Sequence, residues 1–282
     1  MAHVLSSAEL AYRRSLHLVV RADETLLAGQ PLYRGTTDEL FELFDDYLAE
    51  GDTHLIVTPN VDQVLTLLDD ESARSAFAEA RLRLVDGAPL VALAKILGDH
   101  DLRRLTGADL LVSVSAASAS RGWAVAIAGG DPVTSKQAAA KLRVANPGSN
   151  VISVPFPFID RATDPEGLTV VEALARVKPD IVFLCLGAPK QEEWFLAWRH
   201  LLPDAIYVGA GACVDFAAEK RKRAPRIAQS LGAEWLWRVA QEPRRLARRY
   251  FLKGPRFVMI AARSLWPRRL PSAPENEIGT RP

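Results

Sequence analysis

Residues 82–91 read Leu82-Arg83-Leu84-Val85-Asp86-Gly87-Ala88-Pro89-Leu90-Val91, and this segment is the clearest sign of how the chain folds. The short apolar run predicts a strand that stops at an acid and a glycine, and Pro89 then favours the first turn of a helix. Open α/β sheets present functional side chains where a strand ends and a helix begins. Asp86 is therefore our candidate catalytic residue. The alternative is that Asp86 only caps the helix, as aspartates often do.

The same succession of strand, tight polar turn and helix recurs along the chain. Further strands are predicted at 54–57, 123–128, 151–154, 181–186 and 205–208, with helical patterns between them. Parallel strands need such crossover helices, so we predict an α/β fold with a Rossmann-like, mainly parallel sheet covered by helices on both faces. The last strand runs into Gly209-Ala210-Gly211, but Val214 stands where a dinucleotide motif has its third glycine. This argues against an NAD-dependent oxidoreductase.

Basic residues are concentrated after the last predicted strand. Residues 219–269 hold 15 Lys or Arg and three acids, although the whole chain has 35 Lys or Arg, 34 Asp or Glu and a formal net charge of +1. Two helices are predicted there, at about 226–239 and 243–264, with aromatic side chains among the arginines. Phe257 and Met259 beside arginines favour a membrane surface. A nucleic-acid-binding protein would also explain the positive charge.

These patterns divide the chain into four parts. We expect an N-terminal extension (1–28), an α/β core (29–218), a basic helical membrane-associating appendage (219–266) and a disordered tail (267–282). No apolar run reaches the roughly 18 to 20 residues that span a bilayer, and the opening residues lack the order of a secretory signal. We therefore expect a cytoplasmic protein that is peripheral on the inner face of the cell membrane, and the sequence leaves room for a homo-oligomer.

Neither the histidines nor the cysteines have the spacing of metal ligands. The five histidines stand singly, and Cys185 and Cys213 lie in or beside apolar runs. This favours reduced core thiols over a catalytic nucleophile. Asp99-His100-Asp101 has the Asp-x-Asp form that many metal-dependent sugar transferases use, but its polar surroundings predict a solvated loop. We expect no metal and no cofactor.

In their order along the chain, the functional turns resemble the WecG/TagA/CpsF family of bacterial glycosyltransferases. The likeness runs from about Gly29 to Tyr250. It rests on Thr58-Pro59-Asn60, Asp86-Gly87, Arg104 with Gly107 and Asp109-Leu110, Gly129-Gly130, Gly187-Ala188-Pro189-Lys190-Gln191-Glu192-Glu193-Trp194, Arg223-Ala224-Pro225, Glu234-Trp235-Leu236-Trp237-Arg238, Glu242-Pro243-Arg244-Arg245 and Arg248-Arg249-Tyr250. The chain departs from the family pattern at Pro89, at Gly211-Ala212-Cys213-Val214-Asp215 and at Glu219.

The resemblance implies an inverting, metal-independent hexosyltransferase. It would move a hexose or N-acetylhexosamine-type sugar from a UDP-sugar to a polyprenyl-diphosphate-linked saccharide, for an exopolysaccharide, teichoic acid or enterobacterial-antigen type of polymer. Asp86 resembles the family's base. The resemblance, together with the turns described above, assigns substrate binding to Thr58, Asn60, Arg104, Gln191, Arg238, Arg245 and Arg248, and donor-nucleotide binding to Gly129, Gly130, Gly187, Lys190 and Glu192. The expected partners are thus the donor, the lipid-linked acceptor and the membrane surface, and not nucleic acid.

Overall fold

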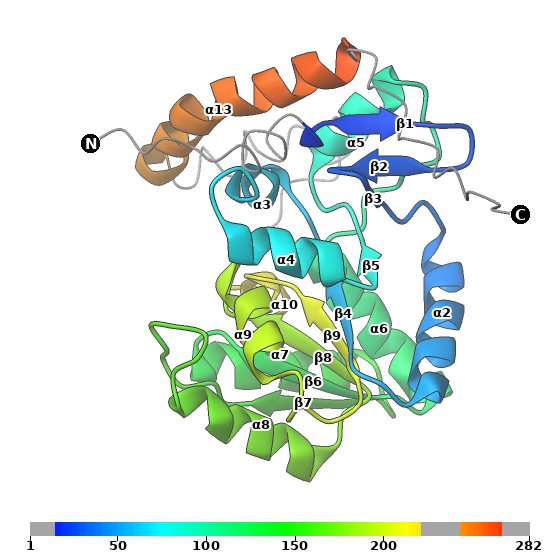
Figure 1. The fold of residues 1–282 in the computed structure, drawn as a ribbon. Coiled ribbons are helices and arrows are strands. Elements are labelled where there is room, and N and C mark those ends of the chain that lie inside the picture. The colour runs from blue at the N-terminus through cyan, green and yellow to red at the C-terminus, as the bar shows by residue number, and fades with distance from the viewer. Residues whose placement is uncertain (1–14, 221–242, 267–282) are drawn as a thin grey trace, which may run out of the picture.

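The computed structural model describes residues 15–220 and 243–266, and of residues 243–252 only the helical backbone. In this part of the chain, six parallel strands form the main sheet in the order β5-β4-β9-β8-β6-β7 (Figure 1). Along the chain they are β4 (His54–Val57), β5 (Leu82–Arg83), β6 (Ala124–Gly129), β7 (Asn150–Val154), β8 (Ile181–Cys185) and β9 (Ile206–Gly209). The predicted α/β, Rossmann-like sheet is confirmed.

Helices cover both faces of the sheet because successive strand residues point to opposite sides. Ile56, Ile127 and Phe183 face one cluster of buried side chains, which is built with α2 (Thr37–Glu50), α6 (Gly107–Arg121), α7 (Pro132–Ala145) and α10 (Cys213–Ala217). Val57 and Leu184 face the other cluster, which is built with α3 (Val61–Thr66), α4 (Glu71–Glu79), α8 (Glu166–Val177) and α9 (Lys190–Trp198). The sheet therefore lies between two packed layers of helices.

A second, smaller sheet lies beside the main one. The antiparallel strands β1 (Leu18–Val20), β2 (Thr25–Leu27) and β3 (Gln30–Pro31) form it, and α5 (Ala88–Ile96) contacts β1. The long helix α13 (Pro243–Leu265) lies across this sheet and α3 (Figure 1). The Leu18 backbone N–H donates to Ser264 Oγ at 2.8 Å, and this bond joins the two ends of the described chain.

The second half of α13 packs on the domain on one side and is exposed on the other. Ile260 is fully buried, and Phe257 packs partly against the core, so the prediction that Phe257 faces a membrane surface is wrong. Met259 and Val258 are exposed, at 42% and 65%. Arg256 pairs with Asp69 at 2.6 Å on the packed side.

Asp99 is buried, which corrects the predicted solvated loop. Its carboxylate accepts hydrogen bonds from the Thr25 hydroxyl, from the backbone N–H groups of Asp101 and Leu102 at 2.9 and 3.0 Å, and from Arg34 at 3.2 Å. Its exposed fraction is only 1% because these donors surround it. Asp99 therefore fastens the small sheet to the segment that leads into α6.

Three features of the described residues bear on the remaining expectations. Cys185 and Cys213 are buried free thiols with their Sγ atoms 3.5 Å apart, as expected of core cysteines. Within residues 15–220 and 243–266, no group of three or more His, Cys, Asp or Glu side chains could hold a metal ion. In the same ranges, no helix has both the length and the apolar character needed to cross a bilayer.

Candidate active site

The candidate site lies where four adjacent strands of the sheet, β5, β4, β9 and β8, reach their carboxyl ends. Because the strands are parallel, the turns that follow them meet at one edge. The Asp86 backbone N–H donates to the Pro59 carbonyl at 3.1 Å, and a Cβ added to Gly87 would lie 3.2 Å from Asn60 Cα. The turn after β5 is thus packed directly on the turn after β4.

Asp86 is not the cap of the helix that follows it. Gly87 occupies the N-cap position of α5, and Pro89 lies in its first turn. The Asp86 side chain is 26% exposed at the sheet edge and lies beside Arg104. The prediction that Asp86 is the N-cap of this helix is therefore wrong, and its carboxylate is partly exposed.

Arg104 contacts Asp86 at two points. Its Nε donates to the Asp86 backbone carbonyl at 2.8 Å, and its Nη2 lies 3.7 Å from Asp86 Oδ1. The segment that carries Arg104 is held in turn, because the Leu105 backbone N–H donates to the Val85 carbonyl at 2.8 Å. Positive charge is thereby fixed next to the candidate base, at the start of α6.

Two of the predicted sugar-binding side chains are buried, and they are hydrogen-bonded to the last residue of β9 and to the turn that follows it. The Thr58 hydroxyl donates to the Gly209 carbonyl at 2.7 Å. The Gly211 backbone N–H donates to Gln191 Oε1 at 3.0 Å. Asn60 is half-buried and caps α3, since its Oδ1 accepts from the backbone N–H groups of Asp62 and Gln63.

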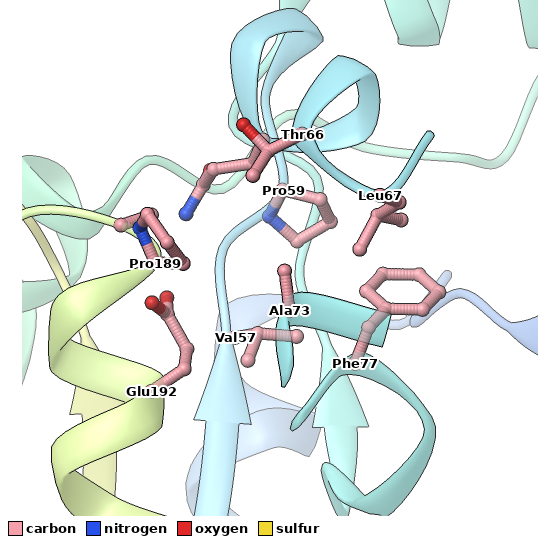
Figure 2. Close-up of a pocket in the computed structure, with 10 residues that line it drawn as sticks. Val57, Pro59, Thr66, Leu67, Ala73, Phe77, Pro189 and Glu192 are labelled. Carbon is pink, nitrogen blue, oxygen red and sulfur yellow. The ribbon is translucent and has the colours of Figure 1, made fainter. Parts of the chain in front are cut away.

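Glu192 is the most deeply buried carboxyl of this edge. Its Oε1 accepts from the Gln191 side-chain amide at 2.7 Å, whereas Oε2 has no hydrogen-bond partner among the described residues. The pKa of Glu192 is raised to about 7, chiefly by burial and to a smaller extent by the charge of Glu193, although the amides of Gln191 and Gln63 act to lower it. The carboxyl lines a pocket of about 370 Å³, its open mouth included, between α3, α4 and the turns that carry Pro59 and Pro189 (Figure 2).

A comparison with known protein families decides the class of activity. Residues 25–271 match the glycosyl transferase WecG/TagA/CpsF family. The protein belongs to this family. It is therefore a glycosyltransferase of a family that acts in the biosynthesis of cell-surface polysaccharides, and it acts on a sugar donor and an acceptor.

Packing leaves little room for a side chain at the paired glycines of this glycosyltransferase. A Cβ on Gly130 would lie 2.6 Å from Val214 Cγ1, and both Gly129 and Gly130 have positive φ, at 109° and 74°. The N-terminus of the next helix, α7, is capped by Asp131, whose carboxylate accepts from the Thr134 backbone N–H at 2.9 Å. The hydrogen bonds from the Thr134 backbone and from its side chain lower the pKa of Asp131. A phosphate at this helix end would meet a negative charge.

Lys220 brings positive charge to this corner of the glycosyltransferase, and sequence patterns alone offered no reason to select it. Its Nζ lies 3.3 Å from Thr134 Oγ1, and its charge also lowers the pKa of Asp131. In the sequence, Lys220 is one base among many at the start of the basic region. Only the packing of α10 against α7 singles it out.

The start of α9 carries the remaining predicted nucleotide contacts. Gly187 is half-buried in the turn after β8. Lys190 Nζ donates to the Ile159 carbonyl at 2.6 Å and lies 5.4 Å from the centre of the exposed Phe158 ring. Lys190 thus holds the segment after β7 against this edge.

Three predicted appendage arginines fall where their contacts are not described. Arg238 lies outside the described residues, and the side chains of Arg245 and Arg248 on α13 do as well. What is described of the appendage lies next to the site: Lys253 on α13 pairs with Asp62 Oδ1 at 3.0 Å. Asp62 belongs to the helix that Asn60 caps.

Proposed function

We propose that this glycosyltransferase moves a hexose or N-acetylhexosamine-type sugar from a UDP-sugar to a polyprenyl-diphosphate-linked saccharide, with inversion and without a metal. One observation carries the proposal. Asp86 is a partly exposed carboxylate at the carboxyl edge of the sheet, beside Arg104, and Gly87 rather than Asp86 is the N-cap residue of α5. A general base for an acceptor hydroxyl needs such an accessible carboxylate.

The proposed reaction is a single displacement. The acceptor hydroxyl oxygen attacks the anomeric carbon of the donor sugar while the Asp86 carboxylate takes the hydroxyl proton. The new bond joins that carbon to the acceptor oxygen, and the bond to the UDP oxygen breaks on the opposite side, so that UDP leaves with the electron pair. Base assistance of this kind contributes about 10² to 10⁴ in rate.

The sugar is proposed to lie between Asn60 and Arg104. Both side chains are half-buried, and the turns that carry them are packed beside Asp86. Thr58 and Gln191 are proposed to serve the sugar through the backbone of the turn after β9, because each is already hydrogen-bonded to it. Replacing Thr58 or Gln191 would then shift the backbone of that turn and also remove a side chain.

The departing diphosphate is proposed to be held by fixed positive charge. Helix N-termini carry partial positive charge, and guanidinium groups bind phosphate oxygens in pairs. We assign the first role to the turns at Gly187 and at Gly129 and Gly130, with Lys190 and Lys220 nearby. We assign the second to Arg238, Arg245 and Arg248.

The acceptor is proposed to reach the site from the inner face of the cell membrane. The described part of α13 combines basic residues with exposed apolar ones, among them Val258, Met259 and Leu265, and the exposed Trp266 follows it directly. A helix with these two kinds of side chain lies well at a lipid surface. Its contacts with α3 would bring that surface close to the turn of Asn60.

An assay with purified protein tests the proposal. A panel of UDP-sugars is incubated with a prenyl-diphosphate-linked sugar, with and without a chelator, and the configuration of the product is read from its anomeric proton coupling. We expect one donor to be used, an inverted product and no effect of the chelator. Failure with every donor, together with tight and salt-sensitive oligonucleotide binding, would favour a nucleic-acid-binding protein instead.

A further inference from the structure

Glu192 stands out among the buried ionisable groups because no catalytic step proposed above uses it. It is 5% exposed, and a buried carboxyl costs free energy unless its oxygens are satisfied. Oε1 accepts from the amide of Gln191, Oε2 makes no hydrogen bond within the described residues, and the Gln63 side chain lies close enough to the carboxyl to lower its pKa. Packing alone does not explain a buried carboxyl at this position, because an apolar side chain would fill the same space at a lower cost in free energy.

The partner of Glu192 leads directly to the candidate site. The Gln191 side chain donates to Glu192 with its amide nitrogen and accepts from the Gly211 backbone N–H with its oxygen. Without an acceptor at position 192, the Gln191 amide nitrogen loses its partner, and only the Gly211 N–H still favours the oxygen end of the amide. Glu192 therefore helps to fix the orientation in which Gln191 binds the turn.

Steric contact at Gly209 reinforces this link. A Cβ at Gly209 would lie 2.6 Å from Gln191 Nε2 and 2.8 Å from Glu192 Oε1, so both side chains lie directly on the end of β9. The Gly209 carbonyl accepts from Thr58 on the other side. The turn after β9 is thus held between Thr58 of one strand end and the Gln191–Glu192 pair of another.

Glu192 also faces the turn after β4. Its carboxyl points toward the turns of Pro189 and Pro59 (Figure 2). The Gln63 side chain lines the same pocket, and its Oε1 accepts from the Asn60 backbone N–H at 2.9 Å. The only charged neighbour that affects Glu192 among the described residues is Glu193, whose carboxylate is bound to the Ser72 hydroxyl on α4.

We propose that Glu192 is a positioning residue for sugar transfer: through Gln191 it holds the Gly209–Gly211 turn, and through Gln63 it supports Asn60, so that both face Asp86 correctly. The proposal rests on the proposed function, because it assigns the substrate to this edge. It differs from the nucleotide-binding role expected from the sequence, since Glu192 is here proposed to act through Gln191 and Gln63 and not on the substrate itself.

The test compares Glu192→Gln with Glu192→Leu. Glutamine keeps an oxygen that can accept from Gln191, so Glu192→Gln should transfer sugar within about threefold of the wild type. Leucine has no acceptor, and Glu192→Leu should lose about tenfold or more in kcat with little change in the donor KM. Glu166→Gln, an exposed acid in the first turn of α8, is the matched control and should leave both constants unchanged.

A double-mutant cycle checks that the effect passes through Gln191. In a Gln191→Leu background, Glu192→Leu should cause little further loss, because coupled residues are not additive. Full additivity, or wild-type kcat in Glu192→Leu, would overturn the proposal. So would a Glu192→Gln variant that folds normally but is as slow as Glu192→Leu.

Hydrogen exchange at the Gly211 amide provides a readout that does not depend on transfer. We expect exchange about tenfold faster in Glu192→Leu, and unchanged exchange in Glu192→Gln. If Glu192→Leu does not fold, the Glu192→Gln result decides, because loss of Gly211 protection in that variant contradicts the link. If the wild type transfers no sugar while these exchange results hold, the proposed function fails and the positioning contact stands.

Discussion

Replacing Glu192 by glutamine should change how the stability of the protein depends on pH. In the folded protein, burial raises the pKa of Glu192 from 4.5 to about 7. Between these values the folded state keeps a proton that the unfolded chain has lost, so the free energy of unfolding falls as pH rises. The shift amounts to about 3 kcal/mol in total, of which about 2 to 3 kcal/mol falls between pH 5 and pH 8.

Glutamine does not titrate, so the free energy of unfolding of Glu192→Gln does not fall in this way as the pH rises. The free energy of unfolding is measured by urea denaturation of the wild type and the variant at four pH values from 5 to 8. We expect the difference, variant minus wild type, to increase by about 2 to 3 kcal/mol across this range in favour of the variant. The exposed Glu166→Gln should follow the wild type. A constant difference between wild type and Glu192→Gln at all four pH values would refute the argument from burial.

Three further substitutions test other contacts of the site. Gly209→Ala places a methyl 2.6 Å from Gln191 Nε2, so we expect a loss of about 1 to 3 kcal/mol in urea denaturation and slower transfer; unchanged stability would mean that Gln191 is not held there. Asp99→Asn exchanges one acceptor oxygen for a donor in a buried cluster, and should cost about 1 to 3 kcal/mol at pH 7, where the lowered pKa keeps Asp99 charged. Its effect should shrink in acid, and a thermal melt at pH 7 equal to that of the wild type would contradict the role of Asp99. Arg104→Lys keeps the charge but not the planar fork, so kcat should fall about tenfold, while urea denaturation should change by less than about 1 kcal/mol because the pair with Asp86 is partly exposed. A wild-type kcat would remove Arg104 from the site.

Local sequence patterns predicted the elements of the main sheet well. His54–Val57 forms β4 with the predicted bounds, and the apolar run at 181–186 forms β8 except for its last residue. Such runs are buried on both faces, so their hydrophobicity is visible in the sequence alone. The turn at Asp86-Gly87 leads into α5 as predicted, although β5 comprises only Leu82–Arg83 and not the whole apolar run before the turn.

Contacts between distant parts of the chain could not be predicted in this way. Thr58 and Gly209 are 151 positions apart, and their bond exists because β9 lies between β4 and β8 in the sheet. A pattern of strands and helices does not contain this order. Thr58 and Gln191 therefore looked like two independent sugar ligands, whereas the structure joins both to one turn.

Asp99 is a second residue whose contacts with distant parts of the chain could not be predicted. Its neighbours in sequence are polar, and this is why a solvated loop was predicted. Its donors Thr25 and Arg34 are 74 and 65 positions away, in the small sheet and just after it. The strands of that sheet are too short to show a clear period of two, so the partner of Asp99 was not visible.

The central claim is that Asp86 acts as the base of sugar transfer, and the transfer rate of Asp86→Asn tests it most directly. Asparagine has nearly the same shape, and Gly87 rather than Asp86 occupies the N-cap of α5, so the variant should fold and bind UDP as the wild type does. With saturating donor and acceptor, we predict a rate lower by a factor of about 10² or more. A rate close to that of the wild type, in a variant shown to be folded, would contradict the account.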